Sequence, residues 1–487
     1  MLIMLLALAS GMAEQLGITE KKNENTGEWY QQVILKSGLA DYSPVSGCMI
    51  LRPKAYHIWE QIQKFFDAEI RKLGVQNCYF PLLIPESLLG KESEHVEGFK
   101  PEVAWVTHGG DSQLPERLAI RPTSETIMYD AYSRWIRSHN DLPLKLNQWC
   151  NVVRWEFKHP MPFLRTREFL WQEGHTAHAT SDSAEQEVYQ ILDLYASVFE
   201  ELLAVPVMKG IKSEKEKFAG AVFTTSVETL LPNGKAIQGA TSHHLGQNFS
   251  KAFGIDFLDE KGEKQHPWQN SWGISTRSIG IMVMMHSDDK GLVLPPAVAP
   301  IEAVIVPIYK EDTRVAVLEG ADEAKRLLKG RRVWIDNRDY TPGWKFHDAE
   351  LQGIPLRIEL GPKDLEKRSA VVVRRDTGTK EVVALADLTG RTTELLAAMQ
   401  RDLLESQRKR IAEQTVDVAS MDELKAAIDA RKMARMPWCG TPASEEKIKD
   451  ATGGAKSINR SRDIAPTEPC ALTGERAQGI YSFAKSY

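Results

Sequence analysis

The sequence predicts a chain of mixed α/β class that folds as several consecutive domains. Helix and strand signals alternate without a low-complexity break from about residue 25 to about residue 295. Proline density then rises over residues 294–300, which marks a domain boundary. Beyond it, apolar runs of strand length are separated by helical stretches. That pattern is typical of a small α/β domain with a largely parallel sheet.

The bulk composition is that of an ordinary globular protein. The chain has 487 residues, with 42% hydrophobic and 26% charged residues, enough for two to four domains. Its net charge of -5 argues against a uniformly basic nucleic-acid coat but leaves room for a local basic face. The five cysteines are scattered and odd in number. They favour a reducing compartment, and hence a cytoplasmic protein, over a disulfide framework.

The first twelve residues are the one compositional oddity. They are apolar and contain Ala-Leu-Ala, like a weak cleavage site, but they lack a basic region and are too short to span a bilayer. A signal peptide is one interpretation. We favour an over-extended start, with translation beginning near Met12. No other stretch is long and apolar enough to cross a membrane.

Two amphipathic helices stand out in the first region. Residues 55–73 place their apolar side chains on one face, and Gly74 ends the helix. Residues 75–85 are strand-like, but Pro81 cannot donate to a ladder, so it marks an edge or a sharp end. Asp182 with Glu185 opens the second helix.

The region after the boundary has its own order of elements. Strands are predicted at residues 303–306, 332–335, 356–360 and 370–374, with helices at 313–328 and after the turn at 340–343. Residues from about 391 to 431 are helical and charged. The last 55 or so residues have low propensity, so we expect them to need a staple or a docking surface.

Arginines beside apolar strand residues carry most of the functional information. Arg154 follows Val152-Val153 and is succeeded by Arg165 in a returning segment, whereas Arg277 lies far along the chain. A permanent cation beside apolar residues is costly unless it meets an anion, and the guanidinium fork suits carboxylate and phosphate. Several such cations converging on one cleft indicate a triphosphate nucleotide and phosphoryl or nucleotidyl transfer.

These segments resemble the three signature motifs of class II aminoacyl-tRNA synthetases. The 55–73 helix with the strand ending at Pro81 resembles motif 1, RWE at 154–156 with the returning Arg165 and Phe169 resembles motif 2, and the segment around Arg277 resembles motif 3. The strings RPTSET (121–126), FLWQEGHTAH (169–178) and GLVLPP (291–296) are most similar to prolyl-tRNA synthetases of the eukaryotic and archaeal type. The resemblance runs from about residue 25 to Tyr487.

The resemblance implies three domains. They are a catalytic domain over residues 13–295 with the antiparallel sheet of class II synthetases, an α/β anticodon-binding domain over 300–400, and a small α+β C-terminal domain over 401–487. It also implies two-step chemistry: L-proline attacks ATP to give prolyl-adenylate and pyrophosphate, and tRNA(Pro) then takes the prolyl group, releasing AMP. Mg²⁺ and a homodimer built through motif 1 belong to the same expectation.

The resemblance assigns roles around the nucleotide. Arg154 would bridge the α-phosphate and the proline carboxylate, and Arg165 and Arg277 would hold the terminal phosphates. Arg154 and Arg277 are therefore the expected catalytic residues. Phe169 and the face of Arg277 would sandwich adenine, with Glu156 near its amino group. The remaining residues implied at the ATP site are Gln238, Thr241 and Trp272.

The resemblance also assigns a proline pocket. Glu125 with Thr123 would meet the imino nitrogen. The expected walls are Trp171, Phe99, His175 and His243, and the other expected lining residues are Glu102, Ser271 and Gly273, next to Arg154. Plainer interpretations stay open: Thr123 to Glu125 fit a helix N-cap, the aromatic residues fit core, and the histidines fit structural roles.

The resemblance extends to the anticodon, where Glu350, Arg357, Lys363 and Asp364 match positions that read two guanines. Carboxylates suit guanine N–H groups, and Arg and Lys suit O6 and N7. Solvated surface charge is the alternative interpretation.

Two departures from the family matter. Gly174 and Ser271 are too close in sequence to hold the editing insertion of bacterial-type members. Cys439 and Cys470 match two of four zinc cysteines, but Ser444 and Thr473 stand at the others. We therefore predict that structural zinc is lost while the domain persists.

Two rival functions stay open. A sister synthetase for threonine, serine, glycine or histidine is the first, and a paralogue that only binds tRNA or a partner protein is the second. The pocket expected around Glu125 and Trp171 favours proline, and the intact arginines favour an enzyme. The charge run at 212–217 is interpreted as a solvated face rather than a strand near tRNA.

Overall fold

The computed structural model describes residues 17–95, 102–156, 159–462 and 465–487, with the side chains of 91–95 excepted. Predictions that fall on residues 1–12 and on Phe99 therefore lie outside the described residues. Within the described chain, no helix combines the length and apolarity needed to cross a membrane. The chain forms two compact units, one built from the segments up to Ala40, His286–Leu294 and Ile301–Leu396, and the other from Asp41–Met285, Pro295–Pro300 and Ala397–Tyr487.

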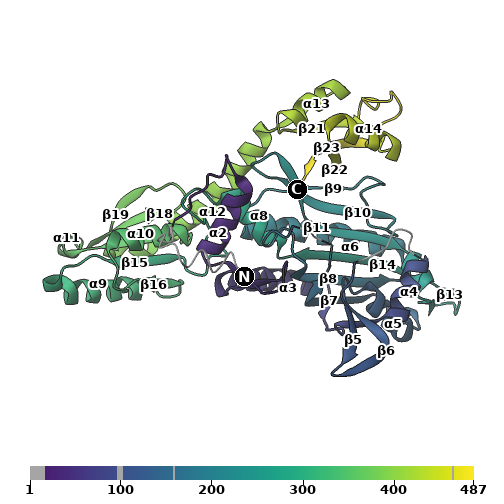
Figure 1. Cartoon of the computed structure of the whole chain (residues 1–487), viewed down its shortest axis with the longest axis horizontal. Coiled ribbons are helices and arrows are strands. Elements are labelled where there is room, and N and C mark those ends of the chain that lie inside the picture. The colour runs from purple at the N-terminus through teal and green to yellow at the C-terminus, as the bar shows by residue number, and fades with distance from the viewer. Residues whose placement is uncertain (1–16, 96–101, 157–158, 463–464) are drawn as a thin grey trace. The chain divides into compact units, whose positions relative to one another are not determined.

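The second unit is built on an eleven-stranded sheet. Its central strands pair antiparallel and follow one another up the view in Figure 1. They are β7 (Leu144–Val153), β8 (Glu168–His178), β14 (Trp268–Ser275), β11 (Lys235–Gly246), β10 (Phe223–Leu230) and β9 (Met208–Ile211). The predicted antiparallel sheet is confirmed.

Helices α3 (Pro53–Lys72) and α6 (Ser181–Ser197) pack their apolar faces together. Phe66 of α3 stacks on Tyr195 of α6 at 5.0 Å between ring centroids and meets Trp272 of β14 edge-on at 6.0 Å. Both helices were predicted. Helix α3 begins two residues earlier than predicted, because Pro53 suits the first helical position, and Thr180 rather than Asp182 caps α6.

The strand-like segment 75–85 forms two short strands rather than one. Strand β3 (Gln76–Asn77) runs parallel to β7, whereas β4 (Leu83–Pro85) joins a separate sheet with β6 (Ser112–Ile120) and β5 (Trp105–Gly109). Pro81 lies between β3 and β4, where its missing N–H ends pairing.

The chain's last segment extends the same sheet. Strands β20 (Thr415–Asp417), β21 (Met433–Trp438), β23 (Gly479–Ser486) and β22 (Ala455–Arg460) continue it beyond β9. We call residues 415–487 the C-terminal module. Its helices are α13 (Met421–Asp429) and α14 (Pro442–Thr452), and the long helix α12 (Leu388–Glu413) leads into it. Strand β23 also runs parallel beside the start of β11. The expected docking surface for this segment is thus the central sheet itself.

The first unit contains a five-stranded sheet in the order β16 (Val333–Ile335), β15 (Ala303–Pro307), β17 (Leu356–Leu360), β18 (Ser369–Arg374) and β19 (Lys380–Ala384). Strand β15 is parallel to both neighbours, but β18 and β19 are antiparallel. The expectation of a largely parallel sheet is therefore wrong for half of the pairings. The link from β17 to β18 is shorter than the dozen or so residues that a parallel crossover needs.

Helices complete this unit. They are α9 (Arg314–Leu327), α10 (Pro342–Leu351), α11 (Pro362–Glu366) and α2 (Thr26–Lys36), whose Trp29 indole donates to the Asp288 carbonyl at 3.1 Å. The other α-helices and β-strands of the described residues are β1 (Ala40–Tyr42), β2 (Met49–Leu51), α4 (Glu86–His95), α5 (Glu125–Trp135), α7 (Asn248–Ala252), β12 (Phe257–Leu258), β13 (Lys264–Gln265) and α8 (Arg277–His286).

Candidate active site

Alternate residues of three central strands form one face of a cavity. Side chains two apart on a strand share a face, and the register aligns these rows across the sheet. His243 of β11 lies opposite Ser271 of β14, which lies opposite His175 of β8. The next row runs from Thr241 through Gly273 to Glu173.

A β-bulge brings one more side chain onto this face. The pairing of β10 with β11 slips between Val227 and Glu228, so that Gln238 lies opposite Glu228 while Thr241 lies opposite Ser226. Because the bulge inserts an extra residue, Gln238 and Thr241 face the same side despite their odd spacing.

The cavity has a volume of about 280 Å³ and collects most of the predicted site residues. Those that line it are Thr123, Glu125, Arg154, Phe169, Trp171, His175, Gln238, Thr241, His243, Ser271, Trp272, Gly273 and Arg277. The Trp272 ring packs against Phe66 on the opposite face, so Trp272 reaches the cavity through its backbone. Gly174 permits this packing, because a Cβ there would lie 2.2 Å from the Trp272 ring.

Sequence reasoning missed eight lining residues: Glu173, Glu216, Phe218, Thr224, Gly239, Ala240, Ile274 and Ser275. Glu173 alternates with Trp171 and His175 in one predicted string, so the period of two could have identified it. Three predicted residues lie elsewhere. Glu102 and Glu156 are exposed and do not line the cavity, and Arg165 lines a neighbouring cavity.

The two predicted catalytic arginines are held by backbone carbonyls. The Arg154 Nε donates to the Pro122 carbonyl at 2.9 Å, and its guanidinium lies 5.3 Å from the Trp171 ring centroid. The Arg277 Nε donates to the Leu164 carbonyl at 3.3 Å. Burial and the nearby charge of Arg154 lower the pKa of Arg277 from its ordinary value. Within the described chain neither arginine forms an ion pair, so this end of the cavity is electropositive.

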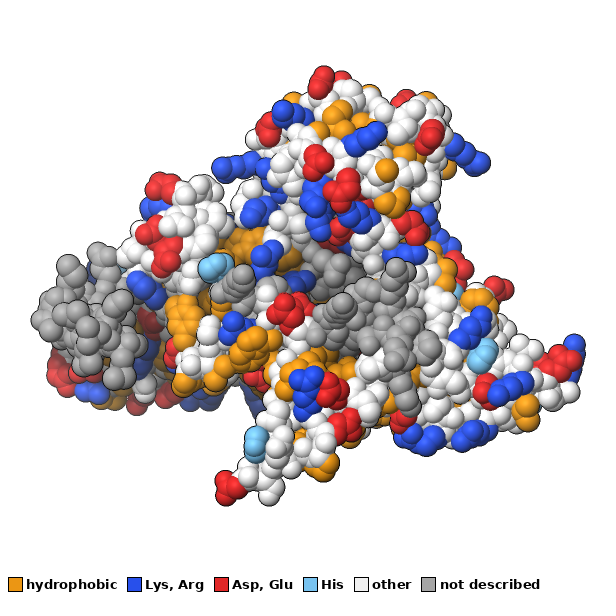
Figure 2. Space-filling view, turned by 45° about the vertical axis from the view of Figure 1, so that its right-hand side comes forward, with side chains coloured by type: hydrophobic (Ala, Val, Ile, Leu, Met, Phe, Trp, Pro, Cys, Tyr) orange, Lys and Arg blue, Asp and Glu red, His pale blue; other side chains and the backbone are white. Residues whose placement is uncertain are grey.

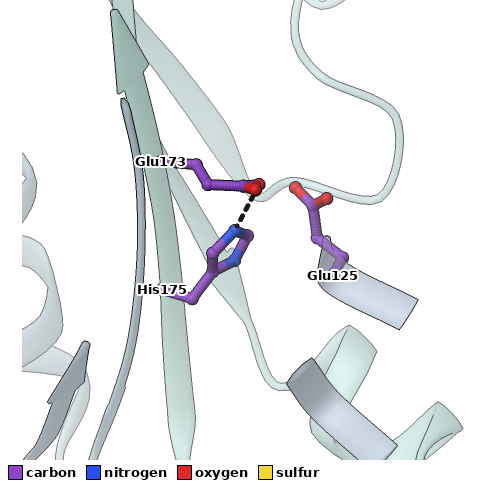
Figure 3. Close-up of side chains that lie close together, drawn as sticks. All are labelled: Glu125, Glu173 and His175. Carbon is purple, nitrogen blue, oxygen red and sulfur yellow. Dashed lines mark hydrogen bonds and ion pairs between the residues drawn. The ribbon is translucent and has the colours of Figure 1, made fainter. Parts of the chain in front are cut away.

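The other end is acidic, as Figure 3 shows. Glu125, Glu173 and His175 offer ligand atoms within 4.8 Å of one another, and all three are buried. Burial alone would raise the pKa of Glu173, but its hydrogen bond with His175, at 3.1 Å, and those from Ser124 and Gln148 lower it instead. Two carboxylates at this end therefore suit a cationic ligand group.

The helix-cap interpretation of this segment is wrong for Ser124. Helix α5 begins at Glu125, and Ser124 at the N-cap makes no side-chain capping bond. Its hydroxyl donates to Glu173 instead, while the Thr123 hydroxyl donates to Glu125. The side chains of Thr123 and Ser124 thus orient carboxylates rather than cap the N-terminus of α5.

His243 forms a neutral wall. Burial and the neighbouring His175 lower the pKa of His243 to about 3. Its Nδ1 lies 2.9 Å from the Thr224 hydroxyl, and its ring centroid lies 4.7 Å from that of Phe218. The pair offers a flat, uncharged surface beside the acidic end.

A second cavity of about 410 Å³ shares Glu216, Gln238 and Arg277 with the first. Its charged lining adds Arg165, Lys212, Glu228 and Lys456. Arg165 donates to the backbone oxygen of Tyr487, and Lys212 pairs with Glu228 at 2.8 Å. The side-chain oxygens of Glu228 and Gln238 are ligands of the kind that Mg²⁺ prefers. The prediction of a solvated face for the 212–217 run holds for Glu214 and Lys215, which are exposed, but is wrong for Lys212 and Ser213, which are largely buried.

The anticodon candidates are distributed over α10, β17 and α11. Arg357 is buried and paired, with its guanidinium 2.9 Å from Glu359 and 3.4 Å from Glu350. Asp364 caps α11 by accepting from the Gly361 N–H at 2.9 Å, and Lys363 is exposed. Solvated surface charge is thus wrong for Arg357.

The two cysteines of the expected degenerate zinc site are buried in the core of the C-terminal module. Burial alone would raise the pKa of Cys439, but hydrogen bonds with Thr441, Ser444 and Cys470 lower it to about 7. The hydroxyls of Thr441 and Ser444 each lie 3.6 Å from Sγ of Cys439. Two thiols and hydroxyls do not fit the four sulfur or nitrogen ligands of structural zinc.

An antiparallel sheet with one arginine directly after β7, a second in the segment that returns to β8 and a third that opens α8 is the arrangement expected of a class II aminoacyl-tRNA synthetase. Family comparisons agree with the geometry. Residues 105–286 match the tRNA synthetase class II core domain (G, H, P, S and T), residues 302–395 an anticodon binding domain, and residues 421–487 the C-terminal domain of prolyl-tRNA synthetase.

Individual relatives indicate which member of the class this chain resembles. The cytoplasmic proline–tRNA ligase of Arabidopsis thaliana is 50% identical over 97% of this chain and 91% of its own length. The proline–tRNA ligase of Natranaerobius thermophilus is 50% identical over 88% and 90%, respectively. The prolyl-tRNA synthetase of Cryptosporidium parvum, solved with halofuginone and AMPPNP, superposes with a TM-score of 0.93 at 48% identity, covering 97% of this chain and all of that one.

The chain belongs to the family of proline–tRNA ligases, the prolyl-tRNA synthetases. The reaction of this family is ATP-dependent aminoacylation of tRNA with proline. The chain spans only 30% of the bifunctional glutamate/proline–tRNA ligase of Mus musculus, to which it is 52% identical.

Proposed function

We propose that this chain joins L-proline to tRNA(Pro) through prolyl-adenylate. One observation carries the proposal: a single cavity has two carboxylates at one end and, at the other, arginines that no carboxylate of the described residues pairs with. An amino acid presents a cation and an anion a few ångströms apart. Such a cavity orients it, with the ammonium toward Glu125 and the carboxylate toward Arg154.

The first step joins two anions, so their repulsion must be cancelled. A proline carboxylate oxygen attacks the α-phosphorus of ATP, and the bond from that phosphorus to the bridging oxygen of the β-phosphate breaks, releasing pyrophosphate. Arg154 would bridge both reactants, and Arg165 and Arg277 would hold the β- and γ-phosphates. The backbone carbonyls that accept from Arg154 and Arg277 fix these two side chains without neutralising them.

The nucleotide subsite continues into the second cavity. The relative from Cryptosporidium parvum binds AMPPNP, which supports ATP as the substrate here. Phe169, Gln238, Thr241 and Arg277 line the first cavity and are proposed to contact ATP. Glu228 and Gln238 would hold Mg²⁺, which when bound would neutralise part of the phosphate charge. Glu156 and the backbone of Trp272 are weaker candidates for adenine contacts.

The proline subsite lies at the acidic end. Glu125, oriented by Thr123, would accept from the secondary ammonium, and Trp171 and His243 would flank the ring. Ser271 adds a buried hydroxyl, which has no hydrogen-bond partner within the described chain. Neutral His243 with Phe218 leaves an apolar wall that fits a pyrrolidine ring better than a hydroxyl-bearing side chain.

The second step needs tRNA. The ribose hydroxyl at the tRNA 3′ end attacks the activated carbonyl, and AMP leaves with the bonding electron pair. Anticodon reading is proposed for Glu350, Arg357, Lys363 and Asp364, supported by their place in the matched anticodon binding domain. A homodimer through motif 1 and a cytoplasmic location, as in the relative from Arabidopsis thaliana, complete the proposal. The bounds 13–295, 300–400 and 401–487 are proposed for the three domains.

The test is ATP–pyrophosphate exchange with each of the five related amino acids. We expect exchange with proline and none above background with threonine, serine, glycine or histidine. Exchange with another amino acid but not with proline would overturn the assignment. Charging of tRNA(Pro) transcript with labelled proline then tests the second step.

A further inference from the structure

Residues 212–218 follow β9 in the link to β10, and we call them the coupling segment. They lie between the C-terminal module and both cavities. Residues at its two ends are fixed to β10 by backbone N–H donors. The Lys212 N–H donates to the Thr224 carbonyl at 2.9 Å, and the Phe218 N–H donates to the Thr224 hydroxyl at 2.9 Å. The segment is therefore an integral part of the cavity wall.

The C-terminal module grips the coupling segment through a buried polar cluster. The Ser213 hydroxyl donates to Glu445 at 2.8 Å, and the Ser457 hydroxyl donates to the same carboxylate at 2.6 Å. All three side chains are buried. Buried polar groups with satisfied partners fix a single arrangement, so the module sets the position of the segment.

One ion pair reaches from this junction to the mouth of both cavities. The Lys456 ammonium of β22 lies 3.0 Å from one Glu216 oxygen and 3.3 Å from the other. Glu216 is the carboxylate that lines both cavities, and Lys456 lines the second. The other carboxylate of the second cavity, Glu228, already has Lys212 as its partner.

The charge of Glu216 matters because the expected ligand of this cavity is an anion. A bare carboxylate beside phosphates would repel them, whereas a paired one presents no net charge. We propose that Lys456 is a positioning residue for the nucleotide: it holds Glu216 and cancels its charge where the polyphosphate lies. The inference rests on the proposed function, since it takes ATP as the ligand. It gives the C-terminal module a role at the nucleotide site.

The test is a thermodynamic cycle on AMPPNP affinity, measured by titration calorimetry in the presence of Mg²⁺. Lys456→Ala leaves one uncompensated negative charge, so we expect about tenfold weaker binding. Glu216→Gln leaves a free ammonium, and binding should tighten. The double variant again has no net charge in the pair, and we expect its affinity to return to within about twofold of the wild type.

Lys449→Ala is the matched control. Lys449 is on the same module, pairs with Glu446 at 3.7 Å and is 47% exposed, compared with 41% for Lys456. It lines neither cavity, so its affinity for AMPPNP should equal that of the wild type. Thermal melting of every variant checks that the fold is intact.

Three results would overturn the inference. Unchanged affinity in Lys456→Ala would remove any role. A double variant as weak as Lys456→Ala would mean that Lys456 contacts phosphate itself. Weaker binding in Glu216→Gln would mean that the carboxylate is a ligand. A wild-type protein that binds AMPPNP but performs no proline-dependent exchange would refute the proposed function, while the cycle would still decide the role of Lys456.

Discussion

Arginines that line the first cavity and arginines in the first unit, which contains the matched anticodon binding domain and is called the anticodon-binding unit below, are stabilised in opposite ways. Arg154 and Arg277 are anchored by backbone carbonyls, and in the described chain no carboxylate pairs with them. Arg338 instead meets Asp336 and Asp348, which raise its pKa, and Arg357 meets Glu350 and Glu359. Charged side chains on the face seen in Figure 2 are likewise of both signs and interspersed.

The difference distinguishes arginines whose charge is available to a ligand from arginines whose charge is already paired within the fold. A carbonyl fixes the direction of a guanidinium while leaving its charge available, whereas a carboxylate consumes that charge. Burial and the charge of Arg154 disfavour the charge of Arg277, so an anion bound in the first cavity would lower the electrostatic energy. In the anticodon-binding unit the same residue type contributes to folding, and any RNA must compete with the carboxylates already there.

The largest expected effect is that of Arg277→Ala. Exchange should fall by at least about 100- to 1000-fold, the loss typical of one preorganised donor at a reacting phosphate. The stability should not fall, because burial and Arg154 disfavour the charge of Arg277 in the folded protein. Pyrophosphate exchange and thermal melting measure the two effects.

Arg338→Ala is the contrasting variant. It leaves buried Asp336 without its partner, so melting should occur at a lower temperature while exchange is retained. The distinction between the two groups of arginines would be lost if Arg277→Ala melted earlier and Arg338→Ala lost exchange.

Sequence reasoning found those parts of the site that depend on residue type and strand periodicity. Arg154 and Arg277 were identifiable because a cation among apolar strand residues needs an anion. Trp171 and His175 share a face because they are two and six residues from Phe169. The same rule shows why Trp272, between Ser271 and Gly273, turns its ring to the opposite face. The family resemblance places Trp272 at the ATP site but does not show that its ring turns away from the cavity.

The remaining features depend on contacts that no local pattern contains. The pair of Glu216 with Lys456 joins residues 240 positions apart. Gln238 reaches the cavity only because a bulge shifts its register. The sheet of the first unit was misjudged because apolar runs do not encode strand direction, which the short link before β18 determines.

The second largest effect sharpens the comparison at the acidic end. Glu125→Gln removes a charge that no described cation neutralises, so KM for proline should rise about 10- to 100-fold with little change for ATP. Stability should change little. Exchange kinetics at varied proline concentration measure this.

Glu187→Gln is the matched control, because Glu187 is equally buried but paired with His178 at 3.1 Å and Lys145 at 3.2 Å, outside the cavity. It should cost about 3–5 kcal/mol of stability and leave KM unchanged. A rise in proline KM for Glu187→Gln equal to that for Glu125→Gln would show that burial, not cavity position, decides the effect.

A smaller effect is expected in the anticodon-binding unit. Arg357→Gln should lower kcat/KM for tRNA(Pro) by about tenfold, as expected for a lost guanine contact, and leave amino-acid exchange intact. Since Arg357 also pairs with Glu359, the unit should melt at a lower temperature. Charging of transcripts with altered anticodons tests the base contact: if Arg357→Gln charged wild-type and altered transcripts in the same ratio as the wild type, its role would be structural only.

The smallest effect is expected from metal removal. Cys439 and Cys470 lie among Trp438, Ile448 and Tyr481 in an apolar core that is already packed, and the hydroxyls near Cys439 are poor zinc ligands. A chelator should therefore leave the melting temperature unchanged, and elemental analysis of purified protein should find no stoichiometric zinc. One zinc per chain, or a melting temperature that falls on chelation, would show that the module has recruited other ligands.

The C-terminal module is expected to hold its position through the central sheet and the Ser213–Glu445–Ser457 cluster, so that Glu445→Gln should loosen it where chelation does not.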